Sequence, residues 1–441
     1  MKIISGAEFD AYWKVSAETA NDEVVEAAVK EIIAAVRTEG DAAVRRFASR
    51  FDKSSPAQLE VPMSAVEKAL VDLRADDPEL AAAMKLAADH IKRFSMKQRA
   101  QFSDFEYEME PGLITGQRVI PIEKVAVYAP GGRYPLFSSL LMALVPAFCA
   151  GAEELILASP PQDDGLPDRK ILAAAGIAAE IVAAECKGKL RVFAVGGVQA
   201  VAALALGTES VPRVDMIAGP GSKHVVTAKR ILFGEVGIDF LPGPSDVLII
   251  ADGTDETGAD LVAADMIAQA EHDPDARAWA LVPNVKLSEQ ITAALERRLA
   301  QLPTADTARA SLDAGGLIVV YRDMKEAIRI ANAIAPEHLE LHLADADSWV
   351  PLLKNYGSLF IGNLSAEAIG DYSAGTNHIL PTMGNARFTG GLSVRHFLKT
   401  VTTLRCAPGD GFEKTRRAAE IMARAEGLEG HALSAAARRR V

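Results

Sequence analysis

The sequence is poor in cysteine, in basic tracts and in long apolar runs, and each shortage excludes a class of protein. Its three cysteines, Cys149, Cys186 and Cys406, form no CxxC pair and are too scattered for a disulfide framework or a zinc–thiolate site. The net charge is −12 and the only dense basic tract is Arg438–Arg440, which argues against a nucleic-acid surface. No uninterrupted apolar run reaches the roughly 20 residues of a membrane span, and Glu8 stands where a signal peptide would be apolar. We therefore expect a cytoplasmic protein that binds neither nucleic acid nor membrane.

The chain does have the length and apolar content for a large core. Its 441 residues are 49% hydrophobic, enough for two or three domains. The first hundred residues are typical of helices, but from residue 125 short apolar runs alternate with alanine-rich stretches, as in buried parallel sheets. One group of runs covers 125–128, 155–158, 179–182, 192–195 and 216–218, and a second covers 247–250, 279–282, 317–321, 339–342 and 359–361. Two α/β units are therefore expected, followed by a helical tail from Asp410.

Imidazole, amide and carboxylate side chains gather in three segments of the second half of the chain. Gln269 and His272 are three residues apart in a helical run, so their side chains share a face where a cation could bridge them. Glu337 and His338 are adjacent at the start of an apolar strand, and alone such a pair is typical of a partly solvated loop end. The segment 371–378 adds a further carboxylate and imidazole. Together these segments hold the residues for one metal site and one acid–base pair, which indicates an enzyme.

Three glycine-rich turns, at 129–132, 195–199 and 218–221, follow strands of the first group. Glycines after a strand let backbone N–H groups approach an anion at a helix N-terminus, as in dinucleotide sites. None of the turns completes GxGxxG, and each taken alone could be a tight turn without a ligand. Their occurrence on one predicted sheet favours a phosphate-bearing ligand.

Six longer motifs resemble those of the histidinol dehydrogenase family, in the same order and with the same spacing over nearly the whole chain. They are Val127–Gly132, Ala218–Gly221, Gly243–Ser245, Gln269–Asp275, Ala335–Leu339 and Gly370–Thr382. The resemblance implies an α/β protein with two Rossmann-like parallel-sheet units, one inserted in the other, a helical N-terminal arm and a helical C-terminal tail, in a domain-swapped homodimer. The expected boundaries are 1–34 for the arm, 35–128 plus 245–385 for the first unit, 129–244 for the second and 386–441 for the tail.

The resemblance also implies a chemistry: a zinc- and NAD-dependent four-electron oxidation of a polar primary alcohol through an aldehyde to a carboxylate, in the first place L-histidinol to L-histidine. His338 would be the general base, and Glu337 would activate the water that hydrates the aldehyde. The zinc ligands would be Gln269, His272, Asp371 and His431. The substrate contacts would be Ser245, Gln269, His272, His338, Asp371, His378, Glu426 and His431, and the NAD contacts would be Tyr128, Gln199 and Ser222. The family usually carries Asn at the position of Ser222, which puts cofactor affinity in doubt.

Several alternatives stay open at this stage. His378 could be a loop histidine tied to Asn377, and Gln199 could cap the helix that begins there. The segments 386–392 and 426–432 also resemble relatives that oxidise 2,3-dihydroxypropane sulfonate. Such a substrate would want a cationic partner, and the candidates are Arg133, Arg387 and Arg395.

Two readings of a different class compete with a dehydrogenase. A metal-dependent hydrolase would use the metal to activate water and would turn over without NAD. A non-catalytic nucleotide-binding regulator would need a broken catalytic pair or ligand set. Glu337, His338 and all four expected ligands are present, so the regulator is the weaker alternative.

Overall fold

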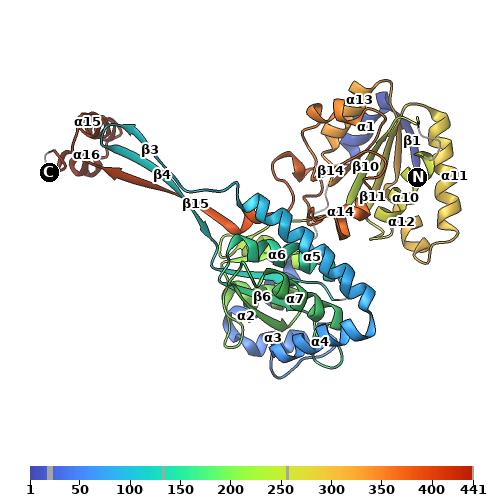
Figure 1. The fold of residues 1–441 in the computed structure, drawn as a ribbon, viewed down its shortest axis with the longest axis horizontal. Helices are drawn as coiled ribbons and strands as arrows, with labels where there is room; N and C mark the ends of the chain where they lie inside the picture. The colour runs from blue at the N-terminus through green and yellow to red at the C-terminus, as the bar shows by residue number, and fades with distance from the viewer. Residues whose placement is uncertain (17–22, 132–134, 255–257, 440–441) are drawn as a thin grey trace.

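The computed structural model describes residues 1–16, 23–131, 135–254 and 258–439. Two lobes lie side by side and an arm extends away from them (Figure 1). Each lobe is built on a six-stranded sheet, and the arm carries a three-stranded sheet. Among the described residues, none of the helices combines the length and apolar character that a membrane crossing requires. Arg133, one of the arginines considered for a sulfonate, lies outside the described residues.

Lobe 1 has an entirely parallel sheet. Its strands are, in sheet order, β1 (Lys2–Ser5), β12 (Leu317–Val320), β11 (Arg277–Val282), β10 (Asp246–Ala251), β13 (His338–His342) and β14 (Ser358–Ile361). Its helices are α1 (Gly6–Ser16), α10 (Gly258–Ala270), α11 (Val285–Leu299), α12 (Ala305–Gly315), α13 (Met324–Ile334) and α14 (Glu367–Tyr372), with the short η1 (Ala346–Ser348) and η2 (Val350–Leu352). Alternate residues of β10 enter different cores: Val247 and Ile249 pack with α10 to α12, and Leu248 and Ile250 pack with α1 and α13. A strand buried on both faces explains why its sequence is continuously apolar.

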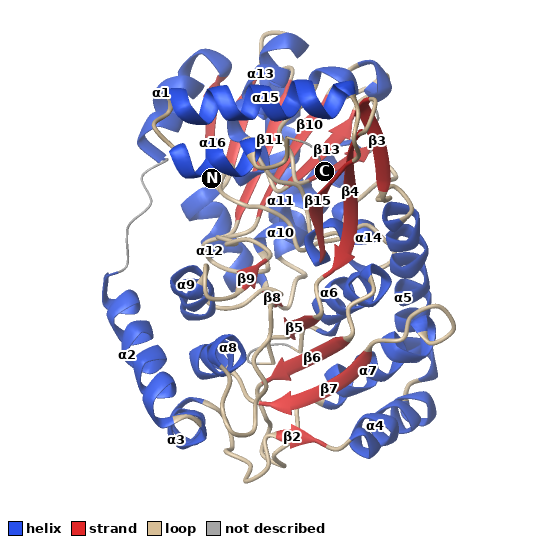
Figure 2. Ribbon diagram, turned by 90° about the vertical axis from the view of Figure 1, so that its left-hand side faces the viewer, coloured by secondary structure: helices blue, strands red, loops and turns tan. Residues whose placement is uncertain are grey.

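Lobe 2 has the same plan, except that its edge strand β2 runs antiparallel to β7. Its strands are, in sheet order, β2 (Glu60–Val61), β7 (Lys189–Ala194), β6 (Glu154–Ser159), β5 (Lys124–Tyr128), β8 (Met216–Ala218) and β9 (Gly237–Ile238). Its helices are α2 (Glu23–Glu39), α3 (Asp41–Phe51), α4 (Met63–Asp76), α5 (Pro78–Arg99), α6 (Phe137–Ala150), α7 (Arg169–Val182), α8 (Gly197–Leu206) and α9 (Lys223–Leu232). In Figure 2, α2, α3, α8 and α9 lie on one side of the sheet, and α4, α5 and α7 lie on the other.

The arm combines segments that are far apart in the sequence. Its strands are β3 (Phe105–Glu110), β4 (Leu113–Pro121) and β15 (Leu398–Cys406), and its helices are α15 (Asp410–Ala425) and α16 (Glu429–Ala436). The short η3 (Asn385–Arg387) and η4 (Val394–Phe397) precede β15. β15 pairs antiparallel with β4 along its whole length, from Leu398 opposite Pro121 to Cys406 opposite Leu113. The arm therefore holds α15 and α16 away from both lobes (Figure 1).

The α/β class with parallel sheets is confirmed, and lobe 2 is inserted between α1 and β10 of lobe 1. The sheets divide the chain differently from the expected boundaries, however. Residues 1–34 are not only helical, because β1 pairs with β12. Residues 35–128 supply α3 to α5, β2 and β5 to lobe 2, where the apolar faces of the helices cover the sheet. The same range also supplies β3 and β4 to the arm. The tail 386–441 is not only helical, since it contains β15. The run 179–182, expected as a strand, is the last turn of α7.

Candidate active site

β13 begins at the amino-terminal edge of the lobe 1 sheet and carries an unusual row of side chains. Because side chains alternate along a strand, those of His338, Glu340 and His342 lie on one face. All three are buried. Buried imidazole and carboxylate groups need partners inside the protein, and here the partners come from the neighbouring helices α10 and α14.

His338 is held so that one ring nitrogen faces the backbone and the other faces a carboxylate. Its Nδ1 atom lies 3.3 Å from the carbonyl oxygen of Asp246, which can only accept a hydrogen bond, so Nδ1 carries the proton. The Nε2 atom lies 3.3 Å from Oδ1 of Asp371, to which it can donate when the ring is protonated. Burial lowers the pKa of His338, but the carboxylates of Glu367, Glu337 and Asp371 outweigh it and raise that pKa well above its ordinary value. The imidazole is therefore placed to take up a proton at Nε2.

Glu337 is tied to Asp246 by a reciprocal pair of hydrogen bonds. The Glu337 backbone N–H donates to Oδ1 of Asp246 at 2.8 Å, and the Asp246 backbone N–H donates to Oε2 of Glu337 at 3.0 Å. Burial raises the pKa of Glu337 to about 8 and that of Asp246 to about 6. Ser245, an expected substrate contact, lies next to this pair, and its carbonyl oxygen accepts a hydrogen bond from the Arg277 N–H. Asp246 therefore fixes both members of the expected catalytic pair.

The end of α10 brings in the expected amide and imidazole ligands. Gln269 is completely buried, and neither its Oε1 nor its Nε2 atom has a hydrogen-bond partner. A buried amide without partners is costly, so this side chain fits a site that is completed by another group. His272 lies just beyond the helix and is exposed, with Nδ1 3.3 Å from the Gln269 carbonyl oxygen.

Asp371, on α14, lies between His338 and His378. Burial raises the pKa of Asp371, but the hydrogen bond from His338 and the charge of that imidazole outweigh burial and lower it. His338 and Asp371 thus lie 3.3 Å apart, and His272 is near enough for its charge to act on Asp371. These side chains suit a divalent cation such as zinc, since they offer imidazole nitrogen and carboxylate oxygen.

His378 has both ring nitrogens engaged. Nδ1 lies 2.7 Å from the Asp371 carbonyl oxygen, and Nε2 lies 2.8 Å from the Ser139 hydroxyl oxygen on α6. The side-chain amide of Asn377 donates to the Met142 carbonyl oxygen at 2.6 Å, again on α6. The loop therefore ties lobe 1 to lobe 2 beside the site, and in this chain His378 is a bridging residue. Burial lowers its pKa, which keeps the ring neutral near pH 7.

Two groups of potential metal ligands occur among the described residues: His338, Glu367 and Asp371 in one, and Asp265, Glu340 and His342 in the other. Sequence reasoning missed Glu367, although its spacing of four from Asp371 places both on one helical face. It also missed the second group. The signal for that group is the alternation of His338, Glu340 and His342 along β13. Glu340 links the groups, because its Oε1 atom accepts the Glu367 backbone N–H at 2.8 Å.

The expected cofactor contacts lie at the carboxyl edge of the lobe 2 sheet. Tyr128 ends β5, and its hydroxyl oxygen accepts the Gly197 N–H at 3.0 Å. Gln199 is buried on α8 and donates to Oδ2 of Asp52 at 3.2 Å, so it does not simply cap the helix. Ser222 is the exposed residue before α9, and its side chain makes no capping hydrogen bond.

A buried ion pair fixes the turn before α9. Lys229 and Asp239 pair directly, and neither side chain is exposed by more than 1%. Lys229 Nζ donates to the Gly219 carbonyl oxygen at 3.0 Å, and Asp239 Oδ2 accepts the Gly219 N–H at 2.8 Å. Gly219 has φ 114°, and a Cβ there would overlap the Tyr128 carbonyl oxygen. The turn 218–221 is thus held in place against the end of β5 at this edge of the sheet.

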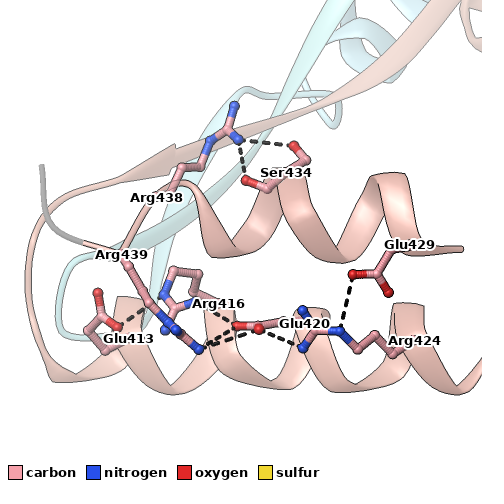
Figure 3. A network of polar contacts seen from close by, with 8 residues as sticks. All are labelled: Glu413, Arg416, Glu420, Arg424, Glu429, Ser434, Arg438 and Arg439. Atoms are coloured by element: carbon pink, nitrogen blue, oxygen red, sulfur yellow. Dashed lines mark hydrogen bonds and ion pairs between the residues drawn. The ribbon is translucent and has the colours of Figure 1, made fainter.

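His431 and Glu426 do not join the other expected site residues within one chain. Both are exposed, His431 on α16 and Glu426 just after α15, at the far end of the arm from α10 (Figure 1). A polar network holds α16 against α15 (Figure 3): Arg424 on α15 donates to Glu429 at 3.4 Å, and Glu420 on α15 accepts from Arg439, just after α16, at 3.1 Å. The arm therefore presents His431 on a structured pair of helices.

Comparison with known proteins agrees with these features. The family model for histidinol dehydrogenase matches residues 15–439. Histidinol dehydrogenase from Thermus thermophilus is 46% identical over 419 residues, which cover 95% of this chain and 95% of that protein. The Pseudomonas aeruginosa histidinol dehydrogenase is 41% identical over 424 residues, covering 96% of this chain and 92% of that protein. A crystal structure of histidinol dehydrogenase from Elizabethkingia anophelis has a TM-score of 0.88 at 31% identity and covers 99% of this chain and 97% of that one. The chain belongs to the histidinol dehydrogenase family and is an oxidoreductase.

Proposed function

We propose that this protein oxidises L-histidinol through the aldehyde to L-histidine, with zinc bound at the site and two NAD consumed in each turnover. The observation that carries the proposal is the placing of His338 Nε2 3.3 Å from Asp371 Oδ1, together with the buried Gln269 amide, which lacks partners. The names of the relatives support the substrate, and the glycine turns of lobe 2 support a nucleotide.

The side chains at the junction of α10 and α14 fit a zinc ion. Gln269, His272 and Asp371 would hold it from lobe 1, and His431 would be the fourth ligand. When bound, zinc supplies a positive charge that anchors and polarises the substrate, and NAD accepts the hydride.

The remaining chemistry belongs to the side chains of β13 and the residue before it. His338 takes the hydroxyl proton at Nε2 in each oxidation, since its Nδ1 proton is committed to the Asp246 carbonyl oxygen. Glu337 takes a proton from the water that adds to the aldehyde. Its pKa of about 8, raised by burial, is close to neutral pH, where a carboxyl group exchanges protons most readily. Asp246 holds His338 and Glu337 in position relative to each other.

We also propose a homodimer in which the arm crosses to the partner and supplies His431 and Glu426 to its site. The support is that α16 lies far from α10 of the same chain and that the arm exposes large apolar side chains (Figure 1). These are Phe105, Tyr107, Met109, Val401, Leu404, Ile421, Met422, Leu428 and Leu433. Many exposed apolar side chains on one projecting unit are typical of an interface. The three cysteines are free thiols, which favours the reducing cytoplasm as the compartment.

We favour L-histidinol over 2,3-dihydroxypropane sulfonate because the relatives are histidinol dehydrogenases. Arg387 and Arg395, two candidates for a sulfonate partner, are both exposed. Arg387 donates to the Ala333 carbonyl oxygen. Neither arginine contacts the cluster around His338, so no described cation is committed to a sulfonate there.

NADH formation by the purified enzyme tests the reaction. We expect two NADH for each L-histidinol consumed, and little turnover of 2,3-dihydroxypropane sulfonate under the same conditions. Zinc-loaded protein that reduces no NAD with L-histidinol would contradict the proposed oxidation, and faster oxidation of the sulfonate would reassign the substrate.

Metal content tests the ligand set, because the two carboxylate–imidazole groups of lobe 1 predict different outcomes. Asp371→Asn should lower zinc affinity by at least about tenfold. The matched control is Asp265→Asn, which removes a carboxylate from the second group and should leave zinc unchanged. Zinc that is retained in Asp371→Asn and lost in Asp265→Asn would move the metal to the second group.

A further inference from the structure

Asp52 is a carboxylate that reaches the nucleotide side of lobe 2 from an unexpected element. It follows the last residue of α3 and is half-buried. Its Oδ2 atom accepts hydrogen bonds from the Gly196 N–H at 3.3 Å and from Gln199 Nε2 at 3.2 Å. These two donors belong to the turn after β7 and to α8, so Asp52 is fastened to the carboxyl edge of the sheet.

The other carboxylate oxygen of Asp52, Oδ1, does not fasten the residue to the sheet in this way. Among the described residues, no donor hydrogen-bonds to Oδ1. A Cβ on Gly196 would lie 2.7 Å from Oδ1, so this oxygen sits directly over the glycine turn. The charge of Asp52 also contributes to raising the pKa of Tyr128 to about 12, after the larger effect of burial, which places it beside an expected NAD contact.

The order of the strands says which part of a nucleotide this oxygen would meet. The sheet order β7-β6-β5-β8 reverses between β5 and β8, and dinucleotides bind at such a switch point. In that arrangement the pyrophosphate lies at the turn after the first strand, and an acidic residue near the end of the next strand binds the adenosine ribose. Here the next strand is β6, which ends at Ser159 and continues with Pro160 and Pro161. The only carboxylate of β6, Glu154, stands at its opposite end, and Asp52 lies beside Pro160.

We propose that Asp52 is a specificity-determining residue that accepts a hydrogen bond from a ribose hydroxyl of NAD and discriminates against NADP. A free carboxylate oxygen accepts a hydroxyl but repels a 2′-phosphate. The neighbouring cation, Lys53, donates to Gln162 Oε1 at 2.5 Å and is engaged there. The proposal rests on the proposed use of NAD and adds to it the residue that selects the nucleotide.

Direct binding of NAD and NADP to the purified full-length protein, without substrate, tests this role separately from turnover. Asp52→Asn keeps an acceptor for Gly196 and removes the charge. We expect it to weaken NAD binding about tenfold, the loss of a hydrogen bond to a charged group, while NADP binding stays equal or tightens. Asp215→Asn is the matched control: Asp215 also accepts a backbone N–H, from Lys124 at 3.1 Å, but at the opposite edge of the same sheet. It should leave the ratio of the two affinities unchanged.

A second variant, Asp52→Ser, and thermal unfolding of all variants guard against misfolding. A purely structural Asp52 would change both affinities by the same factor, and an unchanged ratio in both folded variants would overturn the proposal. A wild-type protein that binds neither nucleotide would overturn it together with the proposed cofactor. Selective NAD binding that is lost in the variants would support Asp52 even if L-histidinol were not the substrate.

Discussion

Glu337 and His338 are adjacent in sequence, but their surroundings give them different tasks. The Nδ1 atom of His338 faces the Asp246 carbonyl oxygen, which leaves Nε2 for the proposed base role, whereas Glu337 holds Asp246 through one oxygen and has the elevated pKa of a buried acid. Glu337→Gln keeps the shape and an acceptor for the Asp246 N–H but cannot take a proton. We expect acid formation to fall about a hundredfold, the usual contribution of one general base, and aldehyde formation to fall much less.

The measurement is NADH formed from L-histidinol with an aldehyde-trapping amine, compared with NADH formed from the aldehyde itself. His338→Asn is the reference, since it should stop both oxidations. If Glu337→Gln reduced both half-reactions equally, water activation would not be the role of this residue.

At the scale of elements, the turn between β8 and α9 depends on the buried pair Lys229 and Asp239. Lys229→Met leaves a carboxylate buried without its cation, which should lower the free energy of unfolding by about 3–5 kcal/mol. Replacing Asp239 by Leu as well removes the stranded charge, so the double variant should recover part of that loss. Urea unfolding of both variants measures this. A single variant as stable as the wild type would mean that the pair does not hold the turn.

The elements also mark how far the sequence alone could predict this fold. Strands such as 125–128 and 247–250 were predictable because burial on both faces makes them continuously apolar. The run 179–182 was not, since so short a segment, with Glu180 among its apolar residues, fits a helix as well as a strand, and here it ends α7. Pairings of β1 with β12 and of β15 with β4 join residues hundreds of positions apart, which no local pattern encodes.

The residues of the candidate site also divide into those that the local sequence predicts and those that only the fold brings together. Gln269, His338 and Asp371 could be singled out from motif and spacing, and the structure buries Gln269 without partners and places His338 3.3 Å from Asp371. Glu367 was not predicted from the sequence because its partner His338 lies on another element. Asp52 could not be predicted, because only the fold brings the end of α3 to the turn after β7.

For the whole molecule, the proposed exchange of arms makes each active site a composite of lobe 1 from one chain and His431 from the other. Co-expression of a His338→Asn chain with a His431→Ala chain therefore gives a decisive test. In the mixed dimer one site combines both defects, while the other has an intact His338 and receives an intact His431. With random mixing half of the dimers are mixed, so activity should recover to about a quarter of the wild-type value.

The matched control pairs His338→Asn with Asp371→Asn, two changes that both lie in lobe 1. No site in any of its dimers is intact, whichever way the arms run, so activity should stay at the level of the single variants. Because a chain that folded its arm back onto its own lobe 1 would leave every site defective in both mixtures, recovery in the first mixture alone requires that the arms cross.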